Sequence, residues 1–490
     1  MTPQTLILLA LAIPVACIGP VLLARRRPDL REAFSLLAGI ATFACVLLLY
    51  GMVAAGERPE LVLGEMLPGL PLVLRIEPLG MLFALIASGL WPVTTLYAIG
   101  YMRGHHEKNQ TRFYAFFALA ISCALGIAFS GNMLTLFVFY EALTIGTFPL
   151  VTHAGTKAAK RAGRVYLGIL LGTSVCFLLL AIVWTWTIAG TLDFVPGGIL
   201  AGKVADWAVA PLLALYVFGI GKAALMPFHR WLPAAMVAPT PVSALLHAVA
   251  VVKAGVFTVL KVTVHIFGLD LLNAGGGVPW LAGAAGFTII AASLVAMSKD
   301  NLKARLAYST ISQLSYVVLG AMILAPLSVM GASIHIAAHA FGKITLFFAA
   351  GAVMVASHKT EISQMAGIGR RMPWTMGAFA VGALSMIGLP PTAGFVSKWY
   401  VLNGAVESGH MAAVGVVIVS TLLNAAYFLP IIHSAFFGEE KHDGDHRNDH
   451  GEAPLPAVAA LVITATATVA FFVAPDWAIG LGGDLVGRAR

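Results

Sequence analysis

The chain has 490 residues, of which 59% are hydrophobic and only 11% are charged, and its mean hydropathy is +0.89. Soluble domains of this length do not have such a composition, so the sequence predicts an integral membrane protein. The four cysteines show no CxxC spacing, which disfavours an iron–sulfur cluster and a disulfide framework. Because GxGxxG and GxxxxGK[ST] motifs are also absent, we expect no cofactor and no redox or hydrolytic site in this chain.

About fourteen apolar stretches are long enough to cross some 30 Å of hydrocarbon as helices. In chain order they span 4–23, 33–55, 78–100, 113–130, 133–151, 165–190, 207–226, 240–266, 278–297, 306–325, 328–356, 374–403, 411–437 and 455–479. The first stretch lacks a basic start and precedes three arginines, so we interpret it as an anchored helix and not as a cleaved signal peptide. Alternating ten-residue strands are absent, so the predicted fold is an all-α polytopic membrane protein.

The net charge of +8 follows the loops and does not indicate nucleic-acid binding. Twenty of the thirty cations fall in alternate loops: Arg25, Arg26, Arg27, Arg31, Arg103, Lys108, Arg112, Lys157, Lys160, Arg161, Arg164, Arg230, Lys299, Lys303, Arg305, Lys359, Arg370, Arg371, Lys441 and Arg447. The other loops and the tail hold five: Arg58, Arg75, Lys203, Arg488 and Arg490. The positive-inside rule makes the first set cytoplasmic and predicts that both termini lie on the outer side of a bacterial inner membrane.

The remaining five cations fall inside predicted spans: Lys222, Lys253, Lys261, Lys343 and Lys398. Glu141 is the acid that lies well inside a span, whereas Glu77 and Asp206 sit at helix starts, where the helix dipole tolerates them. A charge at the bilayer centre costs about 2.5 to 3.5 kcal/mol, so these groups require a polar interior or an escape to the headgroups. Snorkelling explains each lysine separately, and best explains Lys261 near an outer helix end. The whole set favours a polar pathway.

Histidines extend this pattern in the segment SIHIAAHAFGKITLFF. His335, His339 and Lys343 recur at four-residue spacing, which stacks them on one helix face. Such a stripe fits a file of water, and it also fits interhelical hydrogen bonds that hold a bundle together. His247 is a further candidate that carries less information by itself.

Two spans contain breaks beside membrane lysines. GKAALMPFHRWLP places Lys222 before Pro227, and GLPPTAGFVSKWY places two prolines and a glycine before Lys398. Unwound backbone at membrane depth must be buried in protein or line an aqueous cavity. Paired breaks predict two inverted repeats at 112–266 and 278–437, within a single membrane domain that also has helices at 1–111 and 455–479.

Five motifs occur in order along the chain: FYEALTIGTFPLV, GKAALMPFHRWLPAAMVAPTPVSALLHAVAVVKAG, NLKARLAYSTISQLSYV, HIAAHAFGKITLFF and GLPPTAGFVSKW. Together they resemble one known family, the antiporter-like membrane subunits of respiratory complex I, membrane-bound hydrogenases and Mrp-type antiporters. The resemblance covers nearly the whole chain and is closest to the D-type subunit of Mrp antiporters. It implies fourteen helices, two inverted five-helix repeats, and discontinuous seventh and twelfth helices.

The resemblance also implies residue roles. Glu141 matches a glutamate that pairs with the seventh-helix lysine, and Lys222 matches that lysine. Lys253 matches the central lysine of the eighth helix. The remaining matches form the end of a proton relay: His335, His339, Lys343 and Lys398. Burial and neighbouring cations disfavour the ammonium form, so we expect the proton to leave Lys222 when Glu141 moves away.

Three functions stay open from the sequence. The first is a proton-translocating subunit of a multi-subunit Na⁺/proton antiporter, with other membrane subunits, protons, sodium and the bilayer as partners. The second is a proton-pumping membrane subunit of a hydrogenase or NADH-quinone oxidoreductase type complex. The third, a stand-alone solute transporter, is disfavoured because the lysine and histidine chain resembles a proton wire. The loop 439–452 holds His442, His446 and His450, but a solvated connector explains it better than a metal site.

Overall fold

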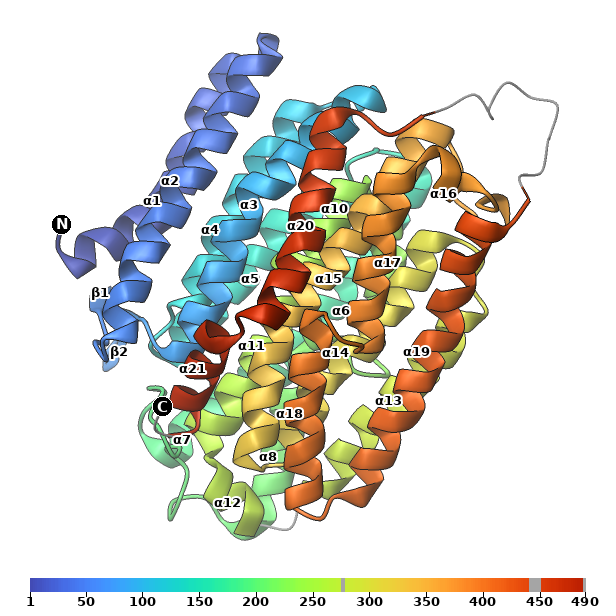
Figure 1. Cartoon of the computed structure of the whole chain (residues 1–490). Helices are drawn as coiled ribbons and strands as arrows, with labels where there is room; N and C mark the ends of the chain where they lie inside the picture. The colour runs from blue at the N-terminus through green and yellow to red at the C-terminus, as the bar shows by residue number, and fades with distance from the viewer. Residues whose placement is uncertain (275–277, 440–450, 488–490) are drawn as a thin grey trace.

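The computed structural model describes residues 1–274, 278–439 and 451–487, and in these ranges it consists of helices and one two-stranded hairpin (Figure 1). The N-terminal part contains α1 (Pro3–Leu23), α2 (Pro28–Ala54), β1 (Glu60–Leu67), β2 (Leu70–Arg75) and α3 (Pro78–Gly104). The first half continues with α4 (Gln110–Ala128), α5 (Met133–Val151), α6 (Lys157–Thr173), α7 (Leu179–Ala189), α8 (Asp206–Gly219), α9 (Trp231–Ala234), α10 (Thr240–Ala244), α11 (Val251–Lys261) and α12 (Leu269–Ala274). The second half contains α13 (Pro279–Met297), α14 (Leu302–Met322), α15 (Pro326–Ser357), α16 (Ile368–Arg371), α17 (Pro373–Ile387), α18 (Ala393–Glu407), α19 (Met411–Phe437), α20 (Leu455–Val473) and α21 (Asp476–Leu485).

The chain is an integral multi-pass membrane protein. Within the described ranges, eleven helices are long and apolar enough to cross a bilayer, and α8 and α17 are shorter apolar helices. Each of the fourteen predicted stretches contains a helix. The count of fourteen spans stays a prediction. The helices α8, α17 and α18 are too short to cross a bilayer by themselves, and α14 is long enough but not sufficiently apolar.

The helix α15 lies at the centre of the second half. It packs against α14, α17, α18 and α20, and also against α3 of the N-terminal part and α10 of the first half. Most of its residues are buried on every side, as expected for a helix that is apolar all round and enclosed by other helices. In contrast, α1 and α2 form an edge of the bundle and contact α3 and α4 (Figure 1).

Both predicted breaks are present. The first follows α8, where the chain forms a 3-10 turn, η3 (Gly221–Ala223), and reaches a left-handed residue, Ala224, at φ 55°. The second separates α17 from α18, and Gly388 ends α17 with φ 91°, a conformation that glycine adopts without strain. The breaks confirm the discontinuous helices that the sequence predicts.

Three segments have π-helical geometry: η2 (Ser174–Leu178), η5 (Leu245–Val249) and η6 (Val262–Phe267). The last two flank α11, so the segment 240–267 is one buried helix whose winding changes three times, from α to π, back to α and again to π. Such insertions shift the face on which later side chains lie, and they are frequent at functional sites.

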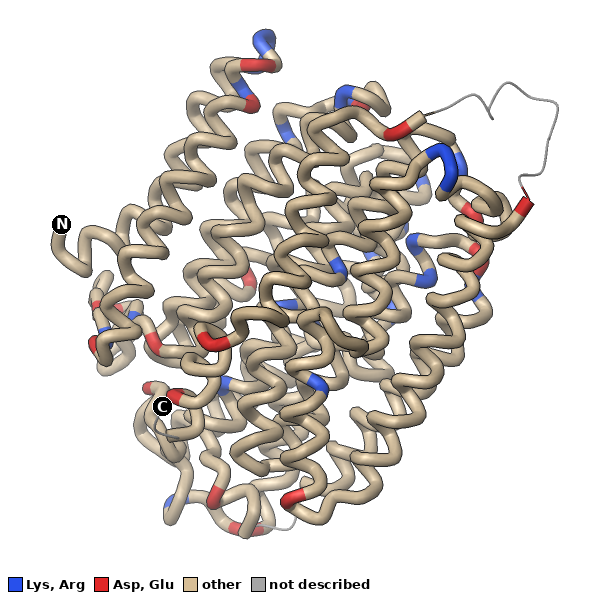
Figure 2. The backbone as a smooth tube through the Cα atoms, in the orientation of Figure 1, with Lys and Arg blue, Asp and Glu red and all other residues tan. Residues whose placement is uncertain are grey.

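The basic residues are unevenly distributed between the two ends of the bundle. Figure 2 shows Lys and Arg gathered at one end, with a few more on the helices between the ends. At that end Arg103 contacts Glu32 and lies 2.6 Å from Asp29, which joins α3 to α2. The loop with His442, His446 and His450 lies outside the described residues.

Candidate functional site

All five membrane lysines are buried inside the protein. Lys222, Lys253, Lys261 and Lys343 have no exposed surface, and Lys398 is 6% exposed. Their ammonium groups therefore do not snorkel to the lipid surface, and each must be satisfied by the protein or by water. Of these five lysines, all within the described part of the chain, Lys261 alone has a carboxylate within ion-pair distance.

Lys222 is held by the α5 backbone. The 3-10 turn after α8 points its Nζ at the carbonyl oxygen of Tyr140, 2.8 Å away, and at Thr144 Oγ1, 2.6 Å away. Nζ also lies 3.1 Å from the centre of the Tyr140 ring, a cation–π contact. Gly255 of α11 lets that helix approach closely, because a Cβ there would contact the backbone of Lys222 and Ala223.

Glu141 does not form the expected ion pair with Lys222 in this conformation. Both of its carboxylate oxygens are buried and lack a hydrogen-bond partner among the described residues. The reason is local, because the preceding residue, Tyr140, supplies the carbonyl that Lys222 uses. An unsatisfied buried carboxylate is costly, and a water molecule, a moving side chain or a partner protein can remove that cost.

Lys253 of α11 and His339 of α15 are in direct contact. Lys253 Nζ lies 2.5 Å from His339 Nδ1, and both side chains are buried. The rings of His339 and His335 lie 6.0 Å apart, one helical turn along α15. This arrangement agrees with the prediction from the sequence that His335 and His339 lie on one face of a helix.

Lys253, His339 and His335 form a buried row of basic side chains, and this row continues from His335 into α18. His335 Nδ1 lies 2.8 Å from Ser397 Oγ, and the next residue is Lys398. Lys398 Nζ donates to the carbonyl oxygens of Met386 and Ile387, each 2.9 Å away, at the C-terminus of α17. The broken helix thus provides the acceptors, since the last carbonyls of a helix have no intrahelical partner and carry a partial negative charge.

Lys343 joins the same site by a second route. Its Nζ donates to Ser309 Oγ at 2.8 Å, and the hydroxyl of Tyr427 lies 3.0 Å from the same oxygen. The Tyr427 hydroxyl donates to Asn424 Oδ1 at 2.5 Å, and Asn424 Nδ2 donates to the Met386 carbonyl at 3.2 Å. A continuous set of hydrogen bonds therefore links Lys343 to the carbonyl that also accepts from Lys398.

Neither of the two additional candidates has a hydrogen bond to this row in the described part of the chain. His247, in η5, is buried 4.8 Å from the Phe347 ring, and neither of its nitrogens has a partner in the described part of the chain. Lys261 forms a buried ion pair with Glu77, and His265 Nε2 lies 3.4 Å from the same carboxylate. Glu77, which the sequence pattern assigns to a tolerant helix start, is therefore a partner of two buried basic groups.

The sequence analysis does not identify the uncharged residues that connect the lysines and histidines by hydrogen bonds. Ser309, Ser397, Asn424 and Tyr427 are polar residue types that occur in ordinary membrane helices, so composition does not distinguish them. A signal existed for Asn424, an uncharged amide in the middle of the apolar stretch 411–437. Its role nevertheless depends on the contact between α17 and α19, which the sequence does not show.

The described side chains offer no resident metal site. No group of three or more His, Cys, Asp or Glu residues within the described ranges is arranged to hold a metal ion. The buried row contains ammonium groups, imidazoles, hydroxyls and carbonyl oxygens, which are groups that donate, accept or relay protons.

The family model described as NADH:quinone oxidoreductase/Mrp antiporter, TM, matches residues 130–424. The matched region is more than half of the chain and contains every residue of the row. The chain belongs to this family. Members of the antiporter-like family with similar sequences include NADH-quinone oxidoreductase subunit N of Desulforudis audaxviator, which is 35% identical over 85% of this chain and 83% of that protein.

Another antiporter-like relative is the D-type subunit of the Na(+)/H(+) antiporter of Alkalihalophilus pseudofirmus, 27% identical over 94% of this chain and 93% of that protein. Among solved structures, the Mrp complex from a Dietzia species contains a chain with a TM-score of 0.86, 20% identity and 99% coverage of this chain. A chain of an archaeal membrane-bound sulfane sulfur reductase gives a TM-score of 0.85 at 25% identity, covering 98%. The antiporter-like fold is therefore shared across the whole length.

Proposed function

We propose that this chain is the proton-translocating subunit of a multi-subunit Na⁺/proton antiporter. The observation that carries the proposal is the buried row from Lys253 through His339 and His335 to Lys398. These residues come from three different helices and meet inside the protein. Stability alone does not require such an arrangement, because several buried cations without nearby acids repel each other.

The row functions through charge coupling. In the described part of the chain no carboxylate lies within 4.0 Å of Lys253, Lys343 or Lys398, so protonation of one group disfavours protonation of the next. A proton entering near Glu141 and Lys222 would displace charge toward Lys253, and then along the histidines to Lys398. Among the described residues no hydrogen bond joins Lys222 to Lys253, so this step requires water.

The comparisons support the antiporter function and a second candidate. The D-type relative matches over nearly the full length of both chains, and it belongs to a Na(+)/H(+) antiporter. The relative that is 35% identical is instead a subunit of NADH-quinone oxidoreductase, which supports the alternative of a proton-pumping subunit in a redox complex. Both candidates place this chain among other membrane subunits and assign the same proton path to it.

We further propose the orientation and the repeat structure. The end of the bundle that carries most Lys and Arg would face the cytoplasm of a bacterial cell, and both termini would face outward. Segments 112–266 and 278–437 would be inverted repeats. The matching position of the two breaks supports this, because one follows α8 at Lys222 and the other precedes Lys398 in α18.

Transport assays on the assembled complex test the function. Inverted membrane vesicles that contain the full set of subunits would be energised, and sodium would be added while a dye reports the pH gradient. Lys253→Met should abolish sodium-dependent collapse of the gradient, and Lys203→Met, an exposed loop lysine, should not. Retained transport in Lys253→Met would reject the proposal, and quinone-linked proton pumping without sodium dependence would favour the redox complex.

A further inference from the structure

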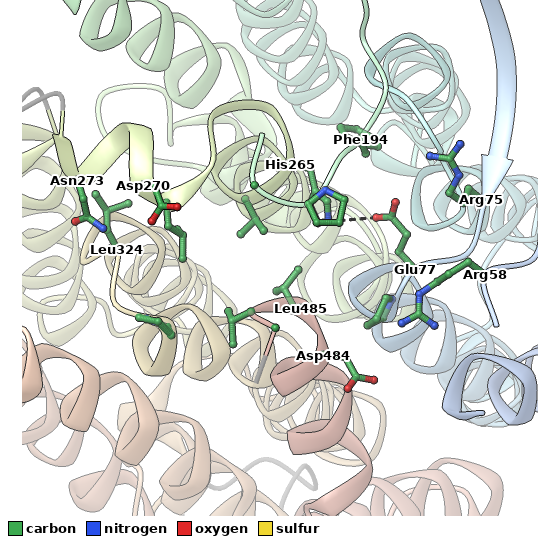
Figure 3. Close-up of a pocket in the computed structure, with 18 residues that line it drawn as sticks. Arg58, Arg75, Glu77, Phe194, His265, Asp270, Asn273, Leu324, Asp484 and Leu485 are labelled. Carbon is green, nitrogen blue, oxygen red and sulfur yellow. Dashed lines mark ion pairs between the residues drawn. The ribbon is translucent and has the colours of Figure 1, made fainter. Parts of the chain in front are cut away.

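A second titratable cluster lies outside the row. Glu77, at the N-terminal end of α3, contacts Lys261 of α11, and its Oε2 lies 3.4 Å from His265 Nε2 in η6. Glu77, Lys261 and His265 are 7%, 0% and 5% exposed. Figure 3 shows Glu77 and His265 directed toward each other beside Phe194. This outer cluster, as we name these three residues, is not part of the proposed relay.

The outer cluster borders a cavity of about 620 Å³. Its walls come from the segment after α2, β2, the loop after α7, η6, α12 and α21 (Figure 3). Two members of the cluster, Glu77 and His265, line this cavity, and Lys261 lies behind them. His265 Nδ1 is buried and has no partner among the described residues. The lining of this cavity includes several charged side chains among apolar ones, and a cavity of this size can hold several water molecules, which can supply that partner.

Two residues of the outer cluster lie on the same helical segment as Lys253, the first residue of the proposed proton relay. Lys253, Phe257, Lys261 and His265 follow each other at four-residue spacing along α11 and into η6, so successive side chains lie one turn apart. Phe257 packs against Phe83 of α3, with ring centroids 5.3 Å apart. An aromatic pair therefore separates Lys253 from Lys261, and the two lysines are about 12 Å apart along the helix axis.

Charge around the outer cluster favours a proton over a metal cation. Lys261 already neutralises the Glu77 carboxylate, and Arg75 and Arg58 also line the cavity. Arg75 is paired with Glu60 at 2.6 Å, and Asp270 and Asp484 also line the cavity. A sodium ion at Glu77 would be repelled by the Lys261 ammonium group, whereas a proton can be shared among a carboxylate, an amine and an imidazole.

We propose that the outer cluster is the proton-exchange site between the relay and the outer aqueous phase, with the cavity as its mouth. This inference rests on the proposed function and orientation. One proton passes from the relay side to the cluster, and one proton leaves from His265 or Glu77 to cavity water. The three side chains then return to their starting charges, so the step needs no other reactant. The Phe83–Phe257 pair separates the cavity from Lys253 between transfers.

The test compares three variants in vesicles that contain the assembled complex. Glu77→Gln removes the carboxylate but leaves Lys261 charged, so a loss of transport there could reflect poor folding. The double variant Glu77→Gln/Lys261→Met removes both charges together and relieves that problem. Glu65→Gln, an exposed acid on the hairpin, is the matched control. We expect the double variant to assemble normally and to transport at least about tenfold more slowly, and the control to behave as the wild type.

The variant Lys222→Met distinguishes a failure of this inference from a failure of the proposed function. If Lys222→Met loses transport while the double variant keeps wild-type rate and dependence on outer pH, the ion pair is structural and the inference is wrong. If Lys222→Met itself keeps transport, the proposed function fails first. A change confined to the sodium concentration for half-maximal rate would identify a cation site and would also overturn the proton assignment.

Cysteine labelling gives an independent readout. Asn273 lies on α12, is exposed and lines the cavity. In a background without Cys176, the exposed native cysteine, Asn273→Cys should react with a membrane-impermeant thiol reagent from the outer side, and the modification should slow transport. Reaction from the cytoplasmic side alone, or labelling without any effect on rate, would contradict the cavity's role as the mouth.

Discussion

Lys253 Nζ lies 2.5 Å from His339 Nδ1, which joins α11 of the first half of the chain to α15 of the second half. The hydrogen bond can form with the lysine amine donating to a neutral imidazole, or with a protonated imidazole donating to a neutral amine. The two halves are therefore connected at a group whose protonation state can change. Substitutions on either side of this contact should separate transport from stability.

Ser397→Ala should slow transport without unfolding the protein. The hydroxyl of Ser397 is the bridge between His335 and the Lys398 helix, and its loss leaves His335 Nδ1 without this partner. We expect a rate about tenfold lower, equivalent to about 1.4 kcal/mol in the transfer barrier. Ser333→Ala is the control, because that buried hydroxyl donates to Met330 in its own helix. Equal rates for the two variants would remove Ser397 from the path.

Tyr427→Phe should interrupt the branch from Lys343. The hydroxyl contacts both Ser309 and Asn424, so its removal breaks two hydrogen bonds and keeps the ring. Tyr216→Phe is the matched control for Tyr427→Phe, because Tyr216 is also buried and its hydroxyl lies 2.8 Å from Thr185, outside the row. Each variant should cost about 1 kcal/mol of stability. Only Tyr427→Phe should lower the transport rate, measured with the vesicle assay, and an equal fall in both would indicate a general packing effect.

Gly255→Ala should destabilise the protein and displace Lys222. A methyl group at this position would meet the backbone of Lys222 and Ala223, which cannot give way as a side-chain tip can. Overpacking of this kind costs about 1 to 3 kcal/mol. A Cβ at Gly283 in α13 would meet no described atom within 4 Å, so Gly283→Ala should be neutral or slightly stabilising. Thermal unfolding of the purified protein in detergent measures both, and a neutral Gly255→Ala would show that the α11 contact is looser than described.

Glu141→Gln should keep or raise stability while it abolishes transport. Because the buried carboxylate has no hydrogen-bond partner in the described part of the chain, removal of its charge loses no contact. Glu32→Gln is the opposite case, because Glu32 contacts Arg31 and Arg103 and its neutral variant should be destabilised. Thermal unfolding and vesicle transport are measured together. A parallel loss of stability and transport in Glu141→Gln would indicate a structural role.

Stability should decrease in acid partly because of His153. This residue lies in the turn between α5 and α6, outside the spans, and burial lowers the pKa of its imidazole below the ordinary value. Its Nε2 lies 2.8 Å from the Lys108 carbonyl oxygen. The unfolded chain binds the proton more readily, so this histidine costs stability as the pH falls below about 6.5. His153→Gln should flatten the dependence of melting temperature on pH between neutral and acidic buffers, and His410→Gln controls for loss of an exposed imidazole.

The helices and breaks were predictable because the bilayer imposes strong rules on sequence. Long apolar stretches must be helical, and proline and glycine beside a lysine mark an unwound segment, as found at Lys222 and Lys398. The hairpin of β1 and β2 was not predicted, since apolar residues such as Val62 and Leu63 are exposed there and do not follow a buried strand pattern. Its register, with Glu60 opposite Arg75, depends on a short connection at Gly69.

The site was predictable in its charged members and not in its connections. Lysines and histidines within apolar stretches are rare enough to be found by inspection, and all of those predicted are buried. The partners depend on which helices meet. Lys222 bonds to a carbonyl and a threonine in place of Glu141, because the backbone of α5 is nearer than the side chain that the motif suggests. Glu77 and Lys261 are 184 residues apart, a separation that no local pattern bridges.

The break between α17 and α18 has a consequence for which residue can occupy position 398. Two backbone oxygens, from Met386 and Ile387, point at the tip of this side chain, and substitution of side chains does not remove them. They select for a group that carries hydrogen. The carboxylate of an acid at the same position would be repelled by these two backbone oxygens unless the acid were protonated. A lysine there can thus donate to both oxygens whether its amine is charged or neutral, whereas an acid can donate only in its neutral form.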